Sequence, residues 1–354
     1  MLDTLRRFLP MADKVVPRRT SLKVLENICI NDGIVRATDL EISIGMKIDS
    51  ENSCLVPLST MRTIMKSKPS TLSCHYVADD RLRIDYGNRS VEFSPMPMED
   101  YPMPVRDDFV DIGTWNKAVV LTMHSLTAFC SDDELRPAMT GVSIKQDEDV
   151  MTLAATDGHV LKKVTLEGDF KPMTAILPKR ALQILPRIVK RQVKASISDS
   201  HLRLIVDHDI ELIVKLIEGT FPDIDRVIPE TTKHEIIVDK SKILDLLVDA
   251  KAFTDKKMRR AMLLFHKSMM DIEVDNVERG MVWKTSIIVE GSMSDDFRIA
   301  VNIDYLDKVF RDVIEDRVSW KFNDPGEAML LYGIGVQREV ILLMPIRIKE
   351  DHDE

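Results

Sequence analysis

The tetrapeptide Thr156-Asp157-Gly158-His159 brings a hydroxyl, a carboxylate and an imidazole together at one place in the chain. An imidazole is the commonest general base in enzymes. No nucleophile or metal-ligand cluster accompanies His159, however, so packing and hydrogen bonding are favoured over the role of a catalytic base. Asp bonds its own backbone and Gly tolerates positive φ, so the same four residues are typical of a tight turn.

Paired carboxylates are the second candidate for chemistry, because magnesium prefers oxygen ligands. Such pairs, which a metal-dependent nuclease would need, occur at Asp79-Asp80, Asp132-Asp133 and Asp295-Asp296. All three lie in turn-like stretches, where Asp is common for other reasons. Glycine-rich nucleotide loops, zinc-protease motifs and CxxC pairs are missing from the sequence. We therefore expect no enzyme, no metal and no cofactor, and the four scattered cysteines indicate a reducing, cytoplasmic setting.

Short apolar runs on both sides of the Thr-Asp-Gly-His corner predict the strands that position it. Met139–Ile144 and Met151–Ala155, separated by the polar turn Lys145–Asp149, are typical of a β-hairpin. A further strand is expected at Val160–Val164, directly after the corner.

Landmarks recur along the chain with a step of about 120 residues. Thr38-Asp39 precedes Thr156-Asp157 by this step, and Asp100-Tyr101-Pro102 similarly precedes Thr220-Phe221-Pro222. Each unit combines two amphipathic helices with strands whose apolar residues alternate, as they do in half-buried antiparallel strands. The sequence therefore predicts an α+β protein of three repeated domains, at 1–108, 109–229 and 230–354.

Apolar residues at helical spacing predict two helices in each domain. The first helices are expected over Leu2–Ala12, over Trp115–Phe129 with Thr114 as its cap, and over Ile243–Ala250. The second helices follow Val56-Pro57, Leu177-Pro178 and Val301-Asn302, the last with apolar residues as far as Ile314. Pro186 predicts a kink or an early end near Leu185.

Basic residues concentrate on the second helices, although the net charge is −9. Between Leu177 and Lys194 the chain has 6 Lys or Arg and no Asp or Glu. Such a run is often only a solvated face; the functional interpretation is a surface facing nucleic-acid phosphates, whose contacts carry no sequence information. In the third domain Asp304, Asp307 and Asp312 interrupt the basic residues. No apolar run of about 18 residues is present, so no membrane span is expected.

Several ordered motifs, together with the threefold repeat, resemble the bacterial-type DNA polymerase sliding clamp, the DNA polymerase III beta subunit family. They are residues 38–41 (TDLE), 136–141 (RPAMTG), 156–159 (TDGH), 221–229 (FPDIDRVIP) and 342–348 (LLMPIRI). The resemblance implies a DNA-clamp fold and a head-to-tail ring of two protomers, with helices lining a central hole. Its partners would be double-stranded DNA, encircled without sequence specificity, and the replicative polymerase and clamp loader, which would bind through linear peptides.

The same resemblance implies functions for three sets of residues. A hydrophobic peptide pocket between the second and third domains would be lined by Met139, Thr156, Gly158, His159, Val160, Leu161, Pro222, Arg226, Val227, Met258, Asn302, Tyr305, Leu342, Leu343, Met344, Pro345, Ile346 and Arg347. DNA contact would fall to Arg19, Arg62, Lys66, Lys179, Arg180, Arg187 and Lys190. The homodimer interface would join Val91 and Phe93 of one protomer to Ala252 and Phe253 of its partner.

The sequence also departs from the family pattern. No strand precedes the helix at Leu2–Ala12, Ser59 stands where the family often has a basic residue, and Val160 replaces a common arginine of the pocket. The acidic tail Lys349–Glu354 extends past the usual end of the family, and we expect it to modulate peptide access. The missing strand and the acidic third-domain helix leave open an alternative, a clamp-like scaffold that binds peptides without closing a ring.

Overall fold

The computed structural model describes residues 1–17, 19–77, 80–336 and 338–347, apart from the side chains of 292–295. The chain forms two compact units, Met1–His124 with Phe170–Glu218 and Ser125–Asp169 with Gly219–Glu354. The tail Lys349–Glu354 lies outside the described residues, so its expected effect on peptide access stays a prediction.

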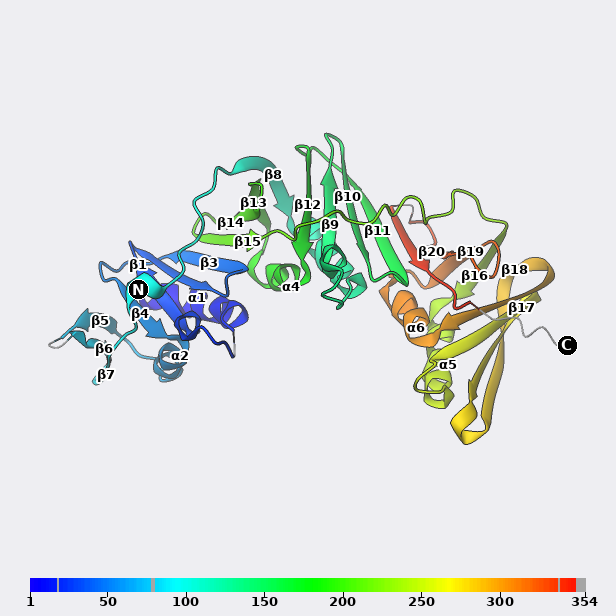
Figure 1. Ribbon diagram of the computed structural model, residues 1–354, viewed down its shortest axis with the longest axis horizontal. Helices are drawn as coiled ribbons and strands as arrows, with labels where there is room; N and C mark the ends of the chain where they lie inside the picture. Colours follow the sequence, from blue (N-terminus) through cyan, green and yellow to red (C-terminus); the bar gives the residue numbers. More distant parts are fainter. Residues whose placement is uncertain (18, 78–79, 337, 348–354) are drawn as a thin grey trace. The chain divides into compact units, whose positions relative to one another are not determined.

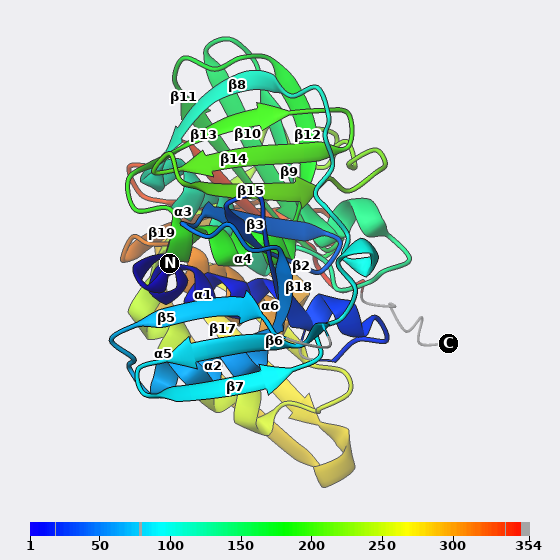
Figure 2. The same cartoon turned by 90° about the vertical axis from the view of Figure 1, so that its left-hand side faces the viewer.

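The first unit contains two antiparallel sheets (Figures 1 and 2). The larger has the strand order β4-β1-β2-β3-β15-β14-β13-β8 and the smaller the order β5-β6-β7. The bounds are β1 Asn27–Asn31, β2 Ile34–Thr38, β3 Ile42–Lys47, β4 Cys54–Pro57, β5 Leu72–Tyr76, β6 Leu82–Tyr86, β7 Arg89–Phe93, β8 Val110–Asn116, β13 Gln192–Ile197, β14 His201–Val206 and β15 Ile210–Lys215. The unit also contains β12 Met173–Pro178, which is not a strand of either sheet. Their apolar residues alternate as the sequence predicts, with Leu202, Leu204 and Val206 of β14 buried.

Helices cover the larger sheet of this unit. Helix α1 contacts strands β2 and β3 and also contacts two other helices, α2 and α4. Its buried residues, Leu5, Phe8, Leu9, Ala12 and Val15, form one stripe at helical spacing, which confirms the predicted first helix. The bounds are α1 Leu2–Val15, α2 Leu58–Lys66, α3 Lys117–Leu126 and α4 Lys179–Ile188, with short 3-10 turns at Lys23–Glu26 and Met98–Asp100.

The helix predicted over Trp115–Phe129 begins later than expected. Trp115 belongs to β8, where it lies opposite Val193 and is fully buried. Asn116 rather than Thr114 caps α3, because its side-chain oxygen accepts a hydrogen bond from the backbone of Val119 at 3.0 Å. The prediction was wrong here because Trp115, a buried strand residue, also fits the apolar spacing of the helix that follows it. The chain leaves the α-helix at Leu126 and continues as a 3-10 turn at Thr127–Phe129.

Pro186 does not end its helix near Leu185, because α4 continues to Ile188. A proline cannot donate to the carbonyl four residues earlier, here that of Leu182. The Nδ1 atom of His124 lies 3.3 Å from this carbonyl oxygen and supplies a replacement partner. The third of the predicted second helices, α6, ends at Asp312, so Val313 and Ile314 lie beyond it.

The second unit is built on one antiparallel sheet with the strand order β9-β10-β11-β21-β20-β19-β16-β18-β17. Helices α5 and α6 contact each other, and α5 also contacts β16, β17 and β18. The core contains an aromatic cluster in which the Phe265 ring lies 6.0 Å from Trp320 and 4.9 Å from Phe322. The bounds are β9 Gly141–Gln146, β10 Val150–Thr156, β11 Val160–Glu167, β16 His234–Asp239, β17 Arg260–Asn276, β18 Met281–Asn302, β19 Arg317–Phe322, β20 Met329–Gly333, β21 Glu339–Leu343, α5 Lys240–Phe253 and α6 Ile303–Asp312, with 3-10 turns at Pro137–Thr140 and Val277–Arg279.

The predicted hairpin and the strand after it are confirmed as β9, β10 and β11, although Met139 lies in the 3-10 turn before β9. The three-domain division stays a prediction. Strands far apart in sequence share sheets, since β3 pairs with β15 in the first unit and β11 pairs with β21 in the second. The compact units therefore do not follow the sequence repeat. No helix in the described part of the chain has the length and apolar character that crossing a membrane requires.

Candidate functional site

The Thr-Asp-Gly-His corner joins β10 to β11 through its own side chains. The Thr156 hydroxyl donates to the carbonyl of Val160 at 2.8 Å and accepts from the amide of Gly158 at 3.0 Å. The Asp157 carboxylate accepts from the amides of His159 and Val160 at 2.9 and 3.0 Å. The Thr156 hydroxyl and one oxygen of Asp157 therefore already have hydrogen-bond partners within the turn. The corner is a rigid support rather than a set of free catalytic groups.

Gly158 is needed for both conformation and space. Its φ is +92°, which residues with a side chain rarely adopt. A Cβ at this position would lie 3.3 Å from Nη1 of Arg136 and 3.6 Å from the terminal methyl of Met139. The structure thus brings Met139, which is buried, over the corner, and it adds Arg136, which the residue-by-residue prediction did not include.

Helix α6 supplies the other side of the corner. The rings of His159 and Tyr305 stack with centroids 5.2 Å apart and planes inclined by 25°. Lys308 donates to Asp157 at 3.4 Å and lies over the Phe129 ring at 5.3 Å. Partial burial raises the pKa of the Tyr305 hydroxyl. Sequence analysis missed Lys308, although its spacing of three residues from Tyr305 places both side chains on one helix face.

The last residues that the structure describes, up to Arg347, run beside the corner. Val160 lies opposite Leu343 and Leu161 opposite Leu342 in the β11–β21 pair, and all four side chains are buried. After β21, the amide of Met344 donates to the carbonyl of His159 at 2.8 Å. The amide of Ile346 donates to Ala300 at 2.7 Å. The half-buried Met344, Pro345 and Ile346 are thereby fixed at the surface next to His159, and Arg347 is exposed.

The segment before β16 lies against the same strands. Ile224 and Ile228 pack on the buried cluster that contains Leu161 and Leu342. Between them Val227 remains 48% exposed. Pro222 and Arg226 are exposed as well, and Arg226 pairs with Asp223 at 2.9 Å. This segment therefore presents Val227 as an apolar side chain and Arg226 as a polar one.

The remaining residues predicted for the peptide pocket, Asn302 and Met258, lie just before α6 and just before β17. The Asn302 side chain caps α6 by accepting from the amides of Asp304 and Tyr305, and so orients the tyrosine. Met258 is 53% exposed on a turn that the Asp255 carboxylate holds. The amide of Ile303 donates to the carbonyl of Arg259, which ties this turn to the start of α6.

A buried ion cluster lies beneath this surface. Lys162 of β11 is only 3% exposed and pairs with Asp312 at 2.7 Å and with Glu339 at 3.1 Å. Burial raises the pKa of the Asp312 carboxyl, against the effect of Lys162. The cluster connects β11, β21 and the end of α6, three of the elements that carry predicted peptide-site residues.

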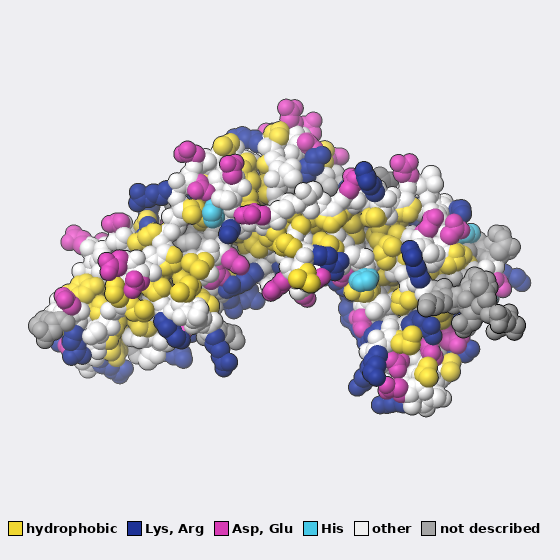
Figure 3. All heavy atoms as spheres, in the orientation of Figure 1, with side chains coloured by type: hydrophobic (Ala, Val, Ile, Leu, Met, Phe, Trp, Pro, Cys, Tyr) yellow, Lys and Arg dark blue, Asp and Glu magenta, His cyan; other side chains and the backbone are white. Residues whose placement is uncertain are grey.

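The predicted DNA contacts all belong to the first unit. Arg19, Arg62, Lys66, Arg180, Arg187 and Lys190 are exposed, and Lys179 is half-buried. Two of them also have structural partners, since Arg62 pairs with Asp13, and Arg180 pairs with Asp39 and donates to the carbonyl of Val15 at 2.9 Å. In the described part of the chain Arg19, Lys66, Arg187 and Lys190 form no ion pair. Figure 3 shows that acidic and basic side chains are interspersed on the face in view.

Ion pairs neutralise the acidic residues of α6. Asp304 pairs with Arg259 and Lys251, and Asp307 pairs with Lys251 and Arg311. Hydrogen bonds from Arg259 hold the pKa of the Asp304 carboxyl below its usual value. These residues therefore carry less free negative charge than the sequence indicates.

The residues predicted for the dimer interface lie in two separate places, on the edge strand β7 and at the end of helix α5. Val91 and Phe93 are half-buried on β7, the outer strand of the three-stranded sheet. Ala252 and Phe253 are exposed at the end of α5. An unpaired edge strand is a ready surface for association with another chain.

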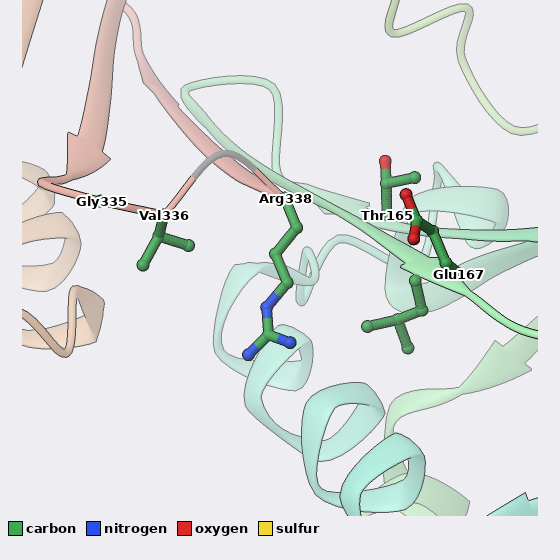
Figure 4. A pocket seen from close by; sticks show the side chains of 6 residues that line it. Thr165, Glu167, Gly335, Val336 and Arg338 are labelled. Atoms are coloured by element: carbon green, nitrogen blue, oxygen red, sulfur yellow. The ribbon is translucent and has the colours of Figure 1, made fainter.

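One open cavity does not include any predicted residue. It measures about 860 Å³ and is lined by Thr165, Leu166, Glu167, Gly335, Val336 and Arg338. In Figure 4 the Arg338 side chain extends from the turn before β21, while Thr165 and Glu167 come from β11.

In the parts of the chain that the structure describes, no group of three or more His, Cys, Asp or Glu side chains is arranged to hold a metal ion. Of the acidic pairs, Asp79 and the side chain of Asp295 lie outside the described residues, and Asp133 caps its own turn.

Comparisons with known proteins agree with this geometry. The family model described as DNA polymerase III beta subunit, central domain, matches residues 117–223, and the C-terminal domain model matches 225–347. The beta sliding clamp of Rickettsia bellii is 24% identical, covering 98% of both chains. Among solved structures, a Pseudomonas aeruginosa sliding clamp bound to griselimycin has a TM-score of 0.86 at 20% identity, covering 98% of both chains. The C. crescentus beta sliding clamp, with PEG bound to a putative beta-motif tethering region, has a TM-score of 0.88 at 22% identity, covering 98% of this chain and 97% of that one. The two family models together match well over half of the chain, which therefore belongs to the DNA polymerase III beta subunit family.

Proposed function

We propose that the protein is a sliding clamp, a processivity factor that encircles duplex DNA and tethers the replicative polymerase and other DNA-processing proteins. It acts in the cytoplasm and is not an enzyme. The observation that carries this proposal is the match of two consecutive beta-subunit domain models to 117–223 and 225–347. The likeness to solved clamps over 98% of the chain extends the same fold to the remaining residues.

The basic side chains of the first unit support the DNA-binding part. Arg187 and Lys190 are exposed at the end of α4, and Lys66 is exposed in the last turn of α2. Since α1 contacts both helices, the three helices form one layer. Point charges on such a layer attract phosphates without reading sequence, as a protein that slides along DNA requires.

The surface around His159 supports the peptide-binding part. Methionine and aliphatic side chains at Met139, Val227 and Met344 adapt to different apolar partners. The stacked pair of His159 and Tyr305 adds polar groups that fix the direction of a bound peptide. Relatives have been crystallised with ligands, griselimycin in one case and PEG in another.

Ring closure and the three-domain division complete the proposal. The β7 edge of one protomer would meet the end of α5 in its partner, so that two copies with three domains each surround the DNA. Because the two joined surfaces differ, each contact is head-to-tail, and contacts of this kind form a ring when the rotation between protomers closes.

The test is retention on DNA at high salt after loading by a cognate clamp loader. Salt removes phosphate attraction but cannot release a closed ring from a circle. We expect retention on circular DNA and loss after linearisation. Equal loss from both forms would contradict ring closure and favour the open peptide-binding scaffold.

A further inference from the structure

Two cysteine thiols of the first unit are in contact. The Sγ atoms of Cys54 and Cys74 lie 3.8 Å apart. Cys54 is the first residue of β4, the edge strand of the eight-stranded sheet, and Cys74 is the central residue of β5, the edge strand of the three-stranded sheet. The thiol contact therefore connects two sheets that share no strand pairing.

Neighbouring side chains hold the two strands together around the thiols. The Asn52 side-chain amide donates to the carbonyl of Cys74. The Tyr76 hydroxyl donates to the carbonyl of Ser53 at 3.1 Å. These two bonds hold the strands together next to both cysteines, and the sulfur atoms need only close from 3.8 Å to about 2.05 Å to form a disulfide.

The other two cysteines cannot join this pair in the folded protein, which makes them controls. Cys54 lies opposite Ile30, whereas Cys29 lies opposite Leu55. Successive residues of a strand point to opposite faces, so Cys29 and Cys54 face opposite sides of the sheet. Cys29 instead packs in a cluster that includes Leu55 and Tyr101. Cys130 belongs to the second unit and is buried there.

We propose that Cys54 and Cys74 form a redox site that a low-molecular-weight disulfide, such as glutathione disulfide, converts into an intramolecular disulfide. The Cys74 thiol loses its proton to solvent and its sulfur attacks glutathione disulfide, which releases one glutathione and leaves a mixed disulfide. Cys54 then loses its proton, attacks the Cys74 sulfur and displaces the second glutathione. Two cysteine thiols lose two electrons and two protons, and one glutathione disulfide becomes two glutathione thiols.

The order of the two steps follows from the environment of each thiol. Cys54 is completely buried, while Cys74 is 6% exposed on a strand whose other residues are mostly exposed. The hydrogen bond between the two thiols is the main cause that raises the pKa of the Cys54 thiol, and burial of Cys54 raises it further. The same hydrogen bond lowers the pKa of the Cys74 thiol. The thiolate is the nucleophile, so Cys74 attacks first.

The disulfide would change the part of the first unit that carries β7. It would close the segment from Cys54 to Cys74, which contains α2, and fasten the three-stranded sheet to β4. Disulfides of reducing compartments are usually transient and redox-sensing. Any effect on ring closure through Val91 and Phe93 of β7 rests on the proposed function, but formation of the disulfide does not.

The test uses the full-length reduced protein in glutathione buffers of increasing oxidised fraction, without denaturant and, as a comparison, in urea. Samples are quenched in acid, their free thiols are alkylated, and the peptides are mapped by mass spectrometry. We expect two of the four thiols to disappear together, a Cys54–Cys74 linked peptide to appear, and dithiothreitol to reverse both changes. Cys29→Ser and Cys130→Ser should give the same link, and Cys54→Ser should stop at the mixed disulfide on Cys74.

Three results would overturn the proposal. They are four free thiols at every buffer composition, a link of either cysteine to Cys29, or a link that forms only in urea. The wild-type mapping alone decides among these outcomes, so the proposal does not depend on any variant folding. Loss of DNA retention in the separate clamp assay would leave the disulfide result unaffected, so failure of the two ideas can be distinguished.

Discussion

Substituting Gly158 by alanine tests whether the corner supports peptide binding. The new Cβ would lie 3.3 Å from Nη1 of Arg136, so the Arg136 side chain must shift outward. Its distance of 3.6 Å from the methyl of Met139 is an ordinary contact and leaves Met139 in place. Gly280 provides a matched control in the same unit. Its φ is +60° in the left-handed region, and a Cβ there would meet nothing within 4 Å.

The two variants should differ in peptide affinity but not in the free energy of unfolding. A side chain at positive φ costs about 1–2 kcal/mol, and the lower entropy of the unfolded chain offsets about 0.5–1 kcal/mol of this. Both Gly158→Ala and Gly280→Ala should therefore lower the free energy of unfolding by about 1 kcal/mol. Only Gly158→Ala also displaces Arg136, whose side chain lies over the corner. Moving a side chain off its preferred rotamer costs about 0.5–1.5 kcal/mol, so we expect peptide binding to weaken by about two- to ten-fold.

The assay is fluorescence anisotropy with a labelled clamp-binding peptide from a replicative polymerase, paired with urea unfolding of each variant. We expect equal losses of stability and a weaker Kd for Gly158→Ala alone. If both variants keep the wild-type Kd, the corner is not part of the peptide site. If both lose affinity equally, the effect comes from general destabilisation and the role assigned to Arg136 is wrong.

Three further predictions use the same protein. Tyr305→Ala should weaken peptide binding about ten-fold by removing the stacked ring beside His159, while Tyr305→Phe keeps the ring and should bind within two-fold or so; equal losses in anisotropy would contradict the stacking argument. Arg187→Glu should lower the slope of log K for duplex DNA against log salt by about 1, and an unchanged slope in titrations at several salt concentrations would exclude a phosphate contact. Because Arg259 lowers the pKa of Asp304, this pair stabilises the fold above the unfolded pKa of about 4 and the contribution is lost as pH falls through the folded pKa. Urea unfolding at a series of pH values from 7 to well below 4 should therefore show that the penalty of Asp304→Asn is full at pH 7 and shrinks as pH falls below 4, and a penalty that stays constant throughout would refute the ion-pair origin.

Alternation and helical spacing predicted most of the secondary structure, because each strand and helix buries one face. The exceptions share a cause. Trp115 fits both a helix and a strand pattern, and only its pairing with Val193, a residue far along the chain, decides for the strand. The continuation of α4 past Pro186 similarly depends on His124, which lies outside that helix. Local sequence cannot reveal partners that arrive from elsewhere in the fold.

The residues of the proposed peptide site likewise include some that local sequence predicts and others that it does not. Its strand residues follow from the motifs, since β11 and β21 pair in register. Arg136 and Lys308 could not be placed in the same way. Arg136 reaches Gly158 from a separate turn, and Lys308 reaches Asp157 from α6. These contacts depend on tertiary packing, and the helix spacing from Tyr305 to Lys308 was the single local signal.

The recurrence of Thr38-Asp39 before Thr156-Asp157 extends to hydrogen bonds. The Thr38 hydroxyl donates to the carbonyl of Ile42 at 3.0 Å and accepts from the amide of Leu40, as Thr156 does with Val160 and Gly158. Leu40 even adopts φ +81° at the position where the second corner has glycine. The amide of Lys215 donates to the carbonyl of Glu41 at 2.8 Å, as the amide of Met344 does to the carbonyl of His159.

The two corners thus share one backbone framework and differ in the side chains mounted on it. At the first corner Glu41 occupies the position of His159, and Asp39 pairs with Arg180 of α4. At the second corner the imidazole of His159 stacks on Tyr305, and Asp157 pairs with Lys308. A repeat in sequence therefore identifies where a corner will form, but not which corner can bind a partner. That distinction rests on a few side chains, which is why the proposed peptide site is tested at Gly158 and Tyr305 rather than at the hydrogen bonds that both corners share.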